Sequence, residues 1–332
     1  MRPRVLVLAP DALFRSFFDE ARQRRLSRGF RWTRSGARTL DRVPALATAD
    51  ALITTWDSPR FPEDALGHAA NVRIVAHVGG EVKGRFAASL FERITITNAP
   101  GPMAGYVAEH ALALLLYAAR NVDAHRDALR RRENAVYARI HRDGVGDETI
   151  AGATVGIFGF GRIGRALAML LKPLGARVLV HDPFVTADAI RRAGAVPVSW
   201  TALLGRSRHL VLAAALTEQT RGIVDRGALA RLADGAVVVN VARGALLDLA
   251  ALTREVRRGR LRCALDVTDP EPLPVNHPLR RLRGAILTPH VGAAQRAVRT
   301  AMADIVLDDL QRFFGGRPPR NRVRAAMLDR MT

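Results

Sequence analysis

Cysteine and aromatic side chains are scarce in this 332-residue chain, and long apolar runs are missing from it. Cys263 is the only cysteine, which excludes an internal disulfide and favours a reducing compartment and a small buried thiol. Aromatic residues make up 5%, so Ala, Val and Leu must fill the core. No apolar run approaches the roughly 18 residues that a membrane span needs, and the run after Met1 is too short for a signal peptide. We expect a cytoplasmic protein without membrane contact.

Lysine is scarce too, and this decides how the positive charge is interpreted. The formal net charge is +20, yet Lys83 and Lys172 are the only lysines among 51 basic residues. Nucleic-acid binding is one interpretation, with the runs 22–34 and 317–324 as its patches. Phosphate accepts lysine as readily as arginine, so the excess of arginine indicates a chain-wide coding bias over solvated surface. We expect no nucleic-acid partner, although a positive field would attract anionic substrates and cofactors.

Short apolar segments alternate with helical ones in two blocks. Helices are predicted at 11–25 and 65–70, and strands at 5–9, 51–55, 73–78, 94–98, 154–160, 177–182, 209–214, 236–242, 263–267 and 285–289. Such alternation predicts parallel sheets with helices on both faces, and the length suits two domains, so we expect an α/β protein with two Rossmann-like domains. Between the blocks, 105–122 predicts a buried apolar helix and 126–150 a polar connector.

The most specific motif is GFGRIG at 159–164, a G-x-G-x-x-G between a predicted strand and a helix. Gly159 would permit the tight turn, Gly161 would let the backbone approach a diphosphate, and Gly164 would let helix pack on strand. The diphosphate would lie at the helix N-terminus, where free N–H groups and the helix dipole favour anions. The next predicted strand ends in Asp182, which would bind the adenosine ribose hydroxyls and repel a 2′-phosphate. The pattern therefore predicts a dinucleotide site that favours NAD over NADP.

Four polar side chains follow the later strands: Arg243 in NVARG, Asp266 in ALDV, Glu271 in PEP and His290 in TPHVG. Each has a structural interpretation, as a surface ion pair, a helix cap, a solvated loop acid or a turn histidine. In an open parallel sheet, however, the carboxyl ends of the strands form the ligand crevice. Beside a dinucleotide fingerprint, these residues are expected to converge on the nicotinamide end of the cofactor.

The motifs GFGRIGR (159–165), LTEQTRG (216–222), NVARGALLD (240–248), ALDVTDPEPLP (264–274) and LTPHVGAA (287–294), with NAPGPMAGYVAEHALALLL (98–116), resemble the D-isomer-specific 2-hydroxyacid dehydrogenases. The resemblance covers about 98 to 294. It implies an NAD-binding Rossmann domain over 101–293, inserted within a split flavodoxin-like substrate domain formed by 1–100 and 294–332. It also implies a homodimer that the apolar helix helps to form.

The resemblance further implies the site residues. The catalytic set would be Arg243, Glu271 and His290, without a metal. The cofactor contacts would come from Gly159, Gly161, Arg162, Ile163, Gly164, Asp182, Thr217, Val241, Ala242, Asp266 and Gly292.

The chemistry of the residues agrees with that assignment. Reduction of a 2-oxo acid needs a hydride on C2 and a proton on the carbonyl oxygen. His290 can supply the proton near neutral pH, and Glu271 would hold its ring. The planar fork of Arg243 can bind the substrate carboxylate and polarise the carbonyl, which a point-charge lysine does poorly. Asp266 would bind the nicotinamide carboxamide. We therefore expect an NAD-dependent dehydrogenase of a 2-oxo/D-2-hydroxy acid.

The substrate loop departs from the family pattern. The family's loop is similar to G-x-G-x-D-x-I-D, whereas this chain has HVGGEVKG at 77–84. Gly79 and Gly80 can still offer N–H groups to a carboxylate. Trp56 and Lys83 would shape the far end of the pocket: an inward Lys83 predicts a dicarboxylic or phosphorylated acid. An outward Lys83, paired with Glu81, leaves Trp56 to select an apolar or aromatic acid, and we favour this apolar monoacid.

Two other functions fit part of the pattern. A formate- or phosphite-oxidising relative is one, but formate-type relatives pair the histidine with glutamine, and Glu271 argues against that. The other is an NAD(H)-sensing, co-repressor-like interaction protein without significant turnover, which the charge of +20 supports. Turnover of NADH with a panel of 2-oxo acids discriminates between them.

Overall fold

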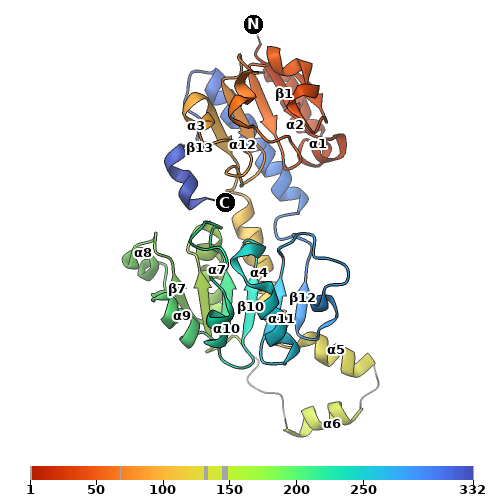
Figure 1. The fold of residues 1–332 in the computed structure, drawn as a ribbon, viewed down its shortest axis with the longest axis vertical. Helices are drawn as coiled ribbons and strands as arrows, with labels where there is room; N and C mark the ends of the chain where they lie inside the picture. The colour runs from red at the N-terminus through yellow and green to blue at the C-terminus, as the bar shows by residue number, and fades with distance from the viewer. Residues whose placement is uncertain (1, 68, 131–133, 144–148, 332) are drawn as a thin grey trace. The chain divides into compact units, whose positions relative to one another are not determined.

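The computed structural model describes residues 2–67, 69–130, 134–143 and 149–331 (Figure 1). Its backbone divides into two compact units. Unit 1 comprises Met1–Met103 and Ala294–Thr332, and unit 2 comprises Ala104–Ala293. The chain passes between the two units at 103/104 and at 293/294. Domain limits at 100/101 and 293/294 stay a prediction.

Unit 1 is built on a six-stranded sheet of order β13-β5-β4-β3-β1-β2. Its strands are β1 (Arg4–Leu8), β2 (Arg31–Ser35), β3 (Ala51–Thr54), β4 (Ile74–His77), β5 (Thr95–Asn98) and β13 (Arg322–Val323). Strands β1 to β5 are parallel in the flavodoxin-like order 2-1-3-4-5, and β13 pairs antiparallel with β5. The predicted flavodoxin-like fold is confirmed. The β3 and β4 strands are buried throughout, as expected of a sheet covered on both faces.

The helices of unit 1 differ from the prediction. They are α1 (Asp11–Phe17), α2 (Glu20–Gly29), α3 (Leu90–Arg93) and α12 (Arg296–Phe314), with 3-10 turns η1 (Leu40–Arg42), η2 (Pro44–Thr48), η3 (Glu63–Gly67) and η7 (Ala325–Arg330). A single helix over 11–25 is wrong, because Phe18 turns inward to stack on Phe14 and Asp19 then caps α2 by accepting from Arg22 N. The helix predicted at 65–70 is wrong where the structure describes it: residues 65–67 belong to the 3-10 turn η3, residues 69 and 70 are not helical, and position 68 lies outside the described residues.

Unit 2 is built on a seven-stranded sheet, which is parallel throughout and has the order β12-β11-β10-β9-β6-β7-β8. Its strands are β6 (Thr154–Phe158), β7 (Arg177–His181), β8 (Val196–Pro197), β9 (His209–Leu212), β10 (Val237–Asn240), β11 (Arg262–Leu265) and β12 (Ala285–Leu287). Counted within the unit, this is the doubly wound order 3-2-1-4-5-6 with one further strand. The predicted Rossmann fold is confirmed.

Helices of unit 2 other than α5 and α6 cover the two faces of this sheet (Figure 1). The helices of the unit are α4 (Met103–Ala119), α5 (Val122–Arg130), α6 (Asn134–Asp143), α7 (Arg162–Leu171), α8 (Ala187–Arg192), α9 (Trp200–Arg206), α10 (Arg226–Ala230) and α11 (Leu249–Arg257), with 3-10 turns η4 (Lys172–Leu174), η5 (Gly244–Leu246) and η6 (Pro278–Arg281). The apolar α4 is buried along much of its length, as predicted, and Cys263 is fully buried in the core.

The polar connector predicted over 126–150 contains helices where the structure describes it, which the sequence did not predict. Helix α5 continues to Arg130, and α6 occupies Asn134–Asp143. Positions 131–133 and 144–148 of that range lie outside the described residues. Among the described residues, no helix is long and apolar enough to cross a membrane, and no three His, Cys, Asp or Glu side chains gather as metal ligands.

Candidate dinucleotide and acid–base site

The three glycines of the turn after β6 have different steric surroundings. Gly159 has φ +93°, and a Cβ there would lie 2.5 Å from the Ala214 backbone. A Cβ at Gly164 would lie closer than 3.0 Å to Gly159 O, so helix α7 can approach the turn only through a glycine. At Gly161 a Cβ would meet nothing within 4 Å. The protein itself therefore does not demand a glycine at 161, and that open space is where a diphosphate would need to come close.

Helix α7 begins directly after this turn. Its N-cap is Gly161, which offers no side-chain hydrogen bond to the first turn. The N–H groups of Arg162 and Ile163 therefore face the turn without a side-chain cap, in the arrangement that binds anions at helix N-termini. The glycine-rich turn and this helix end fit the diphosphate of a dinucleotide.

Asp182 follows β7 and ties the neighbouring loops together. Its Oδ2 accepts from Phe160 N at 2.6 Å, and its Oδ1 accepts from Phe184 N at 2.8 Å. Each carboxylate oxygen has a second lone pair, so the half-buried group can also accept from hydroxyls. These two backbone bonds fix the carboxylate at the end of β7, beside the glycine-rich turn.

Arg243 is held by the turn that follows β10. The Asn240 side chain accepts from Ala242 N at 3.0 Å and donates to Arg243 O at 2.9 Å. The half-buried Arg243 donates from Nη1 to Ala242 O at 2.8 Å. A Cβ at Gly244 would collide with the backbone of Thr268, so only glycine permits the chain to pass there. Arg243 thus supplies a cation in a fixed position, and Gly244 lets its loop pass close to the loop that contains Thr268.

His290 and Glu271 form an ion pair or hydrogen bond on the surface of unit 2. His290 Nδ1 lies 2.7 Å from Glu271 Oε1, and the two side chains are 50% and 41% exposed. Its second ring nitrogen, Nε2, makes no hydrogen bond to the described residues. His290 has φ +55°, a left-handed conformation that a non-glycine residue adopts only when its surroundings impose it.

Asp266 imposes that conformation. It is 3% exposed, and its backbone O accepts from His290 N at 2.9 Å. Its carboxylate accepts from Thr288 Oγ1 at 2.6 Å, from Val291 N at 2.9 Å and from Gly292 N at 2.9 Å. The carboxylate predicted to bind a carboxamide thus also holds the whole TPHVG turn.

The remaining cofactor candidates lie on the loops after β9 and β10. Thr217 is half-buried, and its N–H donates to Thr220 Oγ1 at 2.8 Å, which closes a tight turn. Val241 and Ala242 are 6% and 7% exposed. These loops follow adjacent parallel strands, which is why residues far apart in the sequence end at the same edge of the sheet.

The substrate candidates belong to unit 1. Gly79 O accepts from Ala99 N at 2.8 Å, and Gly80 O accepts from Asn98 Nδ2 at 2.7 Å. Gly79 N donates to His77 O at 3.0 Å, whereas Gly80 N makes no hydrogen bond within the described residues. A Cβ at Gly79 would lie 2.2 Å from His77 Nε2, so a larger residue there would displace the buried imidazole. Gly80, rather than Gly79, has an N–H left for a substrate.

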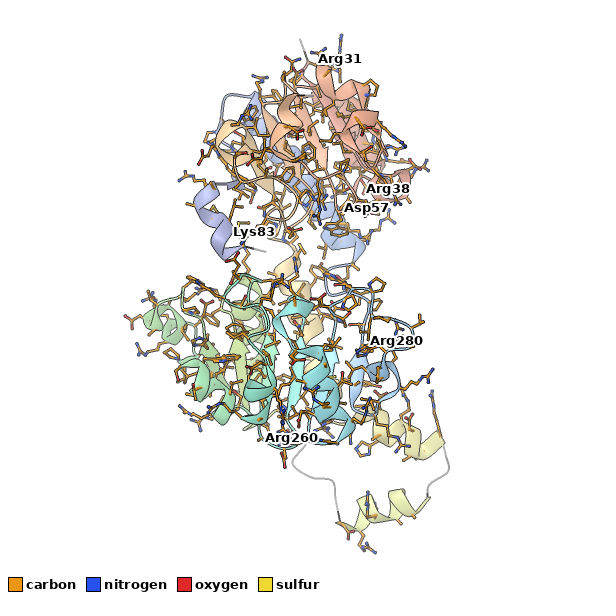
Figure 2. All side chains as sticks on the ribbon, in the orientation of Figure 1. Arg31, Arg38, Asp57, Lys83, Arg260 and Arg280 are labelled. Carbon is orange, nitrogen blue, oxygen red and sulfur yellow. The ribbon has the colours of Figure 1, made fainter. Side chains whose placement is uncertain are left out.

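Trp56 and Lys83 have different surroundings. The half-buried indole of Trp56 packs edge-on against Phe17 at 5.0 Å, and the Arg299 guanidinium lies over it at 5.4 Å. Lys83 is exposed on the loop after β4 (Figure 2). No ion pair joins it to Glu81 in the described structure, where Glu81 Oε1 accepts from Gly84 N instead. The outward position of Lys83 is found, but the pairing expected with it is wrong.

Sequence reasoning missed several residues that fix the site. His77 and Asn98 end β4 and β5 and hold the glycine loop, and Arg299 covers Trp56 from α12. In unit 2, Asn240 and His110 hold neighbouring turns. The only signal in the sequence was a polar residue at the end of an apolar strand, which His77, Asn98 and Asn240 share.

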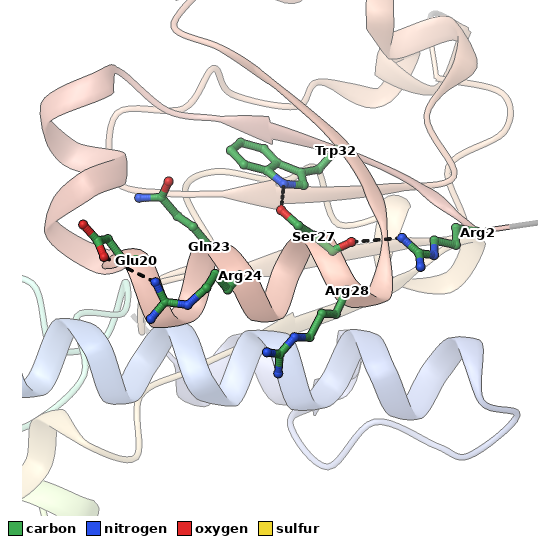
Figure 3. A pocket seen from close by; sticks show the side chains of 7 residues that line it. All are labelled: Arg2, Glu20, Gln23, Arg24, Ser27, Arg28 and Trp32. Carbon is green, nitrogen blue, oxygen red and sulfur yellow. Dashed lines mark hydrogen bonds and ion pairs between the residues drawn. The ribbon is translucent and has the colours of Figure 1, made fainter.

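A shallow groove of about 520 Å³ lies elsewhere on unit 1, between the chain start, α2 and β2 (Figure 3). Its polar groups bind one another: Arg24 pairs with Glu20, and both Arg2 and Trp32 donate to Ser27. Arg22 and Arg25 of the same basic run form ion pairs with Asp304 and Asp308. We therefore do not place the site in this groove.

Comparison with known proteins identifies the family. The sequence model of the D-isomer specific 2-hydroxyacid dehydrogenase, NAD binding domain, matches residues 112–292, which lie within unit 2. D-3-phosphoglycerate dehydrogenase of Archaeoglobus fulgidus is 32% identical over 83% of this chain, which spans only 52% of that relative. Glyoxylate reductase of Korarchaeum cryptofilum is 33% identical, with 85% of this chain and 84% of the relative covered.

A solved structure is similar over the whole length. The NADPH-dependent glyoxylate/hydroxypyruvate reductase of Sinorhizobium meliloti, in complex with NADP and malonate, is 26% identical with a TM-score of 0.78, and 100% of this chain and 98% of that chain are covered. Unit 2 is therefore an NAD-binding domain and binds a nicotinamide dinucleotide. The chain belongs to the D-isomer-specific 2-hydroxyacid dehydrogenase family.

Proposed function

We propose that the protein is an oxidoreductase that interconverts a 2-oxo acid and a D-2-hydroxy acid with NAD(H). One observation carries the proposal: the His290–Glu271 pair and Arg243 extend from the ends of neighbouring strands in the NAD-binding unit. When bound, the dinucleotide donates a hydride to C2 of the oxo acid or accepts one from the hydroxy acid. Proton transfer, substrate binding and orientation are the tasks of the protein's own residues.

His290 acts as the acid and base. Glu271 occupies Nδ1, so Nε2 is the ring nitrogen that can give a proton to the carbonyl oxygen, or take one from the hydroxyl. The Glu271 carboxylate fixes both the tautomer and the direction of the ring. A half-exposed ring can exchange its proton with water between turnovers.

Arg243 binds the substrate carboxylate. Its guanidinium presents several donors in one plane, a geometry that matches a carboxylate and leaves a donor for the carbonyl oxygen. The bond from Nη1 to Ala242 O orients the fork before the substrate arrives, which lowers the entropic cost of binding. Polarisation of the carbonyl by this cation assists addition at C2.

NAD is proposed to be the preferred dinucleotide, with contacts from the glycine-rich turn, Arg162, Ile163, Thr217, Val241, Ala242 and Gly292. The relative from Sinorhizobium meliloti is NADPH-dependent, so the family alone does not decide the preference. The fixed Asp182 carboxylate supports NAD, because it would accept from ribose hydroxyls and repel a 2′-phosphate. Asp266 is proposed to add a contact to the carboxamide.

In unit 1, Gly79, Gly80 and Trp56 are proposed to contact the acid, with Gly80 N as the donor to its carboxylate. The exposed position of Lys83 favours a monoacid with an apolar side chain. The protein is proposed to act in the cytoplasm as a homodimer, with the apolar α4 near the contact. Ion pairs of Arg22 and Arg25 within the arginine-rich run argue against a nucleic-acid partner.

The test is consumption of NADH by the purified protein with a panel of 2-oxo acids, read from the loss of NADH absorbance, together with NADH titration by fluorescence. Saturable turnover with at least one acid, and formation of the D-hydroxy product, is expected. Tight NADH binding without turnover of any acid contradicts the enzyme and favours the NAD(H)-sensing, co-repressor-like protein.

A further inference from the structure

Helix α4 carries a histidine that the proposed mechanism does not use. His110 is 19% exposed, and its Nε2 lies 3.3 Å from Asp266 Oδ1 and 3.2 Å from Thr288 Oγ1. Its Cδ2 also lies 3.5 Å from where a Cβ of Gly292 would be. His110 therefore contacts the start and the end of the turn that carries His290.

These contacts form one hydrogen-bonded chain. Thr288 Oγ1 donates to Asp266 Oδ1, so its lone pairs face His110 Nε2–H. The same Oδ1 accepts from Val291 N, and Oδ2 accepts from Gly292 N. His110 of α4 thus adds one more donor to the Asp266 carboxylate. Because Asp266 is only 3% exposed, the loss of a hydrogen-bond donor there is costly.

The side chain also joins two segments that the chain order keeps apart. Helix α4 is the first segment of unit 2, while Val291 and Gly292 are among its last residues before the chain leaves at Ala293. The neighbours of His110 on the buried face are the apolar Val107, Ala111 and Leu114. A leucine would fill such a face more simply, so the imidazole is explained by its polar contacts rather than by packing.

We propose that His110 is a positioning residue for His290, acting through Thr288 and Asp266. Its N–H holds the Asp266 carboxylate in the one orientation that satisfies both backbone donors of the turn. This keeps His290 at φ +55° with its ring on Glu271. The inference rests on the proposed function, in which His290 is the acid and base.

The experiment compares His110→Leu, which removes the donor, with His110→Gln, which keeps an N–H of similar reach. Glu109→Gln, an exposed neighbour on α4, is the matched control. In His110→Leu, kcat at saturating NADH falls about tenfold, because a displaced acid transfers its proton less efficiently. The Kd for NADH rises by a smaller factor, because only the proposed carboxamide contact of Asp266 is disturbed. His110→Gln recovers most of the loss, and Glu109→Gln equals the wild type.

A second readout does not depend on turnover. In cofactor-free protein, the ring resonances of His290 in NMR spectra shift in His110→Leu and return in His110→Gln. A wild type that turns over while His110→Leu matches it in kcat and in these resonances overturns the role of His110 alone. If His110→Gln loses as much kcat and as much Tm as His110→Leu, the positioning role is overturned, and His110 contributes only to packing. A wild type without turnover contradicts the proposed function instead, and the resonances then decide the role of His110.

Discussion

Units 1 and 2 are both built on mainly parallel sheets, but they differ in how completely their buried polar side chains are hydrogen-bonded. In unit 2, the buried Asp266 carboxylate has a donor on each oxygen, and in the described part of that unit no buried side-chain N or O lacks a hydrogen-bond partner. Among the described residues of unit 1, five such atoms lack one. They are His77 Nε2, Arg85 Nε, Ser89 Oγ, Thr97 Oγ1 and Arg299 Nε.

The difference in hydrogen-bond satisfaction matches the different roles proposed for the two units, catalysis in unit 2 and substrate binding in unit 1. A buried unsatisfied polar atom costs about 1–3 kcal/mol, so natural proteins keep few of them. Two of the five border proposed substrate residues, since His77 Nε2 faces Gly79 and Arg299 lies over Trp56. The closed network of unit 2 is suited to hold reacting groups in one geometry. The incomplete one of unit 1 is suited to accept a water or substrate atom.

The largest effect is expected in the closed network. Arg243→Ala and His290→Ala should each lower kcat/KM at least about a hundredfold, because the first removes carboxylate binding and the second removes the acid. The Kd for NADH should barely change, as measured by fluorescence titration. Arg281→Ala, an exposed arginine of the same unit, is the control. Loss of NADH binding, or near-normal turnover, would mean that the site is wrongly assigned.

A smaller effect is expected at Asp182. The wild type should bind NADH at least about tenfold more tightly than NADPH, since the fixed carboxylate opposes the 2′-phosphate. Asp182→Ser should reduce the difference in Kd, measured calorimetrically. The exposed Asp188, on α8, gives the control variant Asp188→Ser, which keeps the preference. Equal dissociation constants in the wild type would sink the assignment.

The sequence predicted features that depend on local sterics and strand order. The roles of Gly159 and Gly164 in GFGRIG follow from the close approach of backbone, and motif context reveals them, whereas the close passage at Gly244 was found only in the structure. It missed features set by distant partners or by weak patterns. Strand β2 is a polar edge strand, RWTRS, without a clear apolar period. Helix α5 is amphipathic but short and arginine-rich, and none of its described residues is buried, which is why the sequence predicts a polar connector there. His110 was missed because its partners, Asp266 and Thr288, lie far along the chain.

A pH experiment tests whether the buried polar atoms of unit 1 that lack a hydrogen-bond partner lower the free energy of unfolding. Burial lowers the pKa of His77 to about 3 and that of His209, in unit 2, to about 4. Both folded pKa values lie below the unfolded value of about 6.5, so the unfolded state binds the proton first and stability falls as pH drops from about 6.5 toward 3. His77→Leu should remove on the order of 2 kcal/mol of this loss between pH 6.5 and 4.5.

Chemical denaturation of the wild type, His77→Leu and His209→Leu measures the slopes. At pH 8, His77→Leu and His209→Leu should have similar costs, because each removes one buried ring hydrogen bond: His77 Nδ1 is bonded to Thr54 Oγ1, and His209 Nδ1 accepts from Val237 N. Parallel slopes for the wild type and His77→Leu would show that the ring is already protonated in the fold, and so has an acceptor.

The smallest effect is expected at Lys83, whose exposure in unit 1 bears on the choice of substrate. Lys83 is exposed and makes no ion pair within the described residues, whereas Trp56 is half-buried. An apolar acid such as phenylpyruvate or 2-oxoisocaproate should therefore be preferred over oxaloacetate and phosphohydroxypyruvate. Lys83→Ala should change each kcat/KM by less than about twofold, the size expected for an exposed charge.

The measurement is kcat/KM for the four acids in the wild type, Lys83→Ala and Arg299→Gln. A preference for doubly charged acids that vanishes in Lys83→Ala refutes the apolar substrate and brings Lys83 into the site. A preference that survives Lys83→Ala but vanishes in Arg299→Gln assigns the second anion to Arg299, whose guanidinium lies 5.4 Å from the Trp56 ring centre and keeps a buried Nε without a partner. In that case the unsatisfied polar atoms of unit 1 select the charge of the substrate, and the indole selects only its shape.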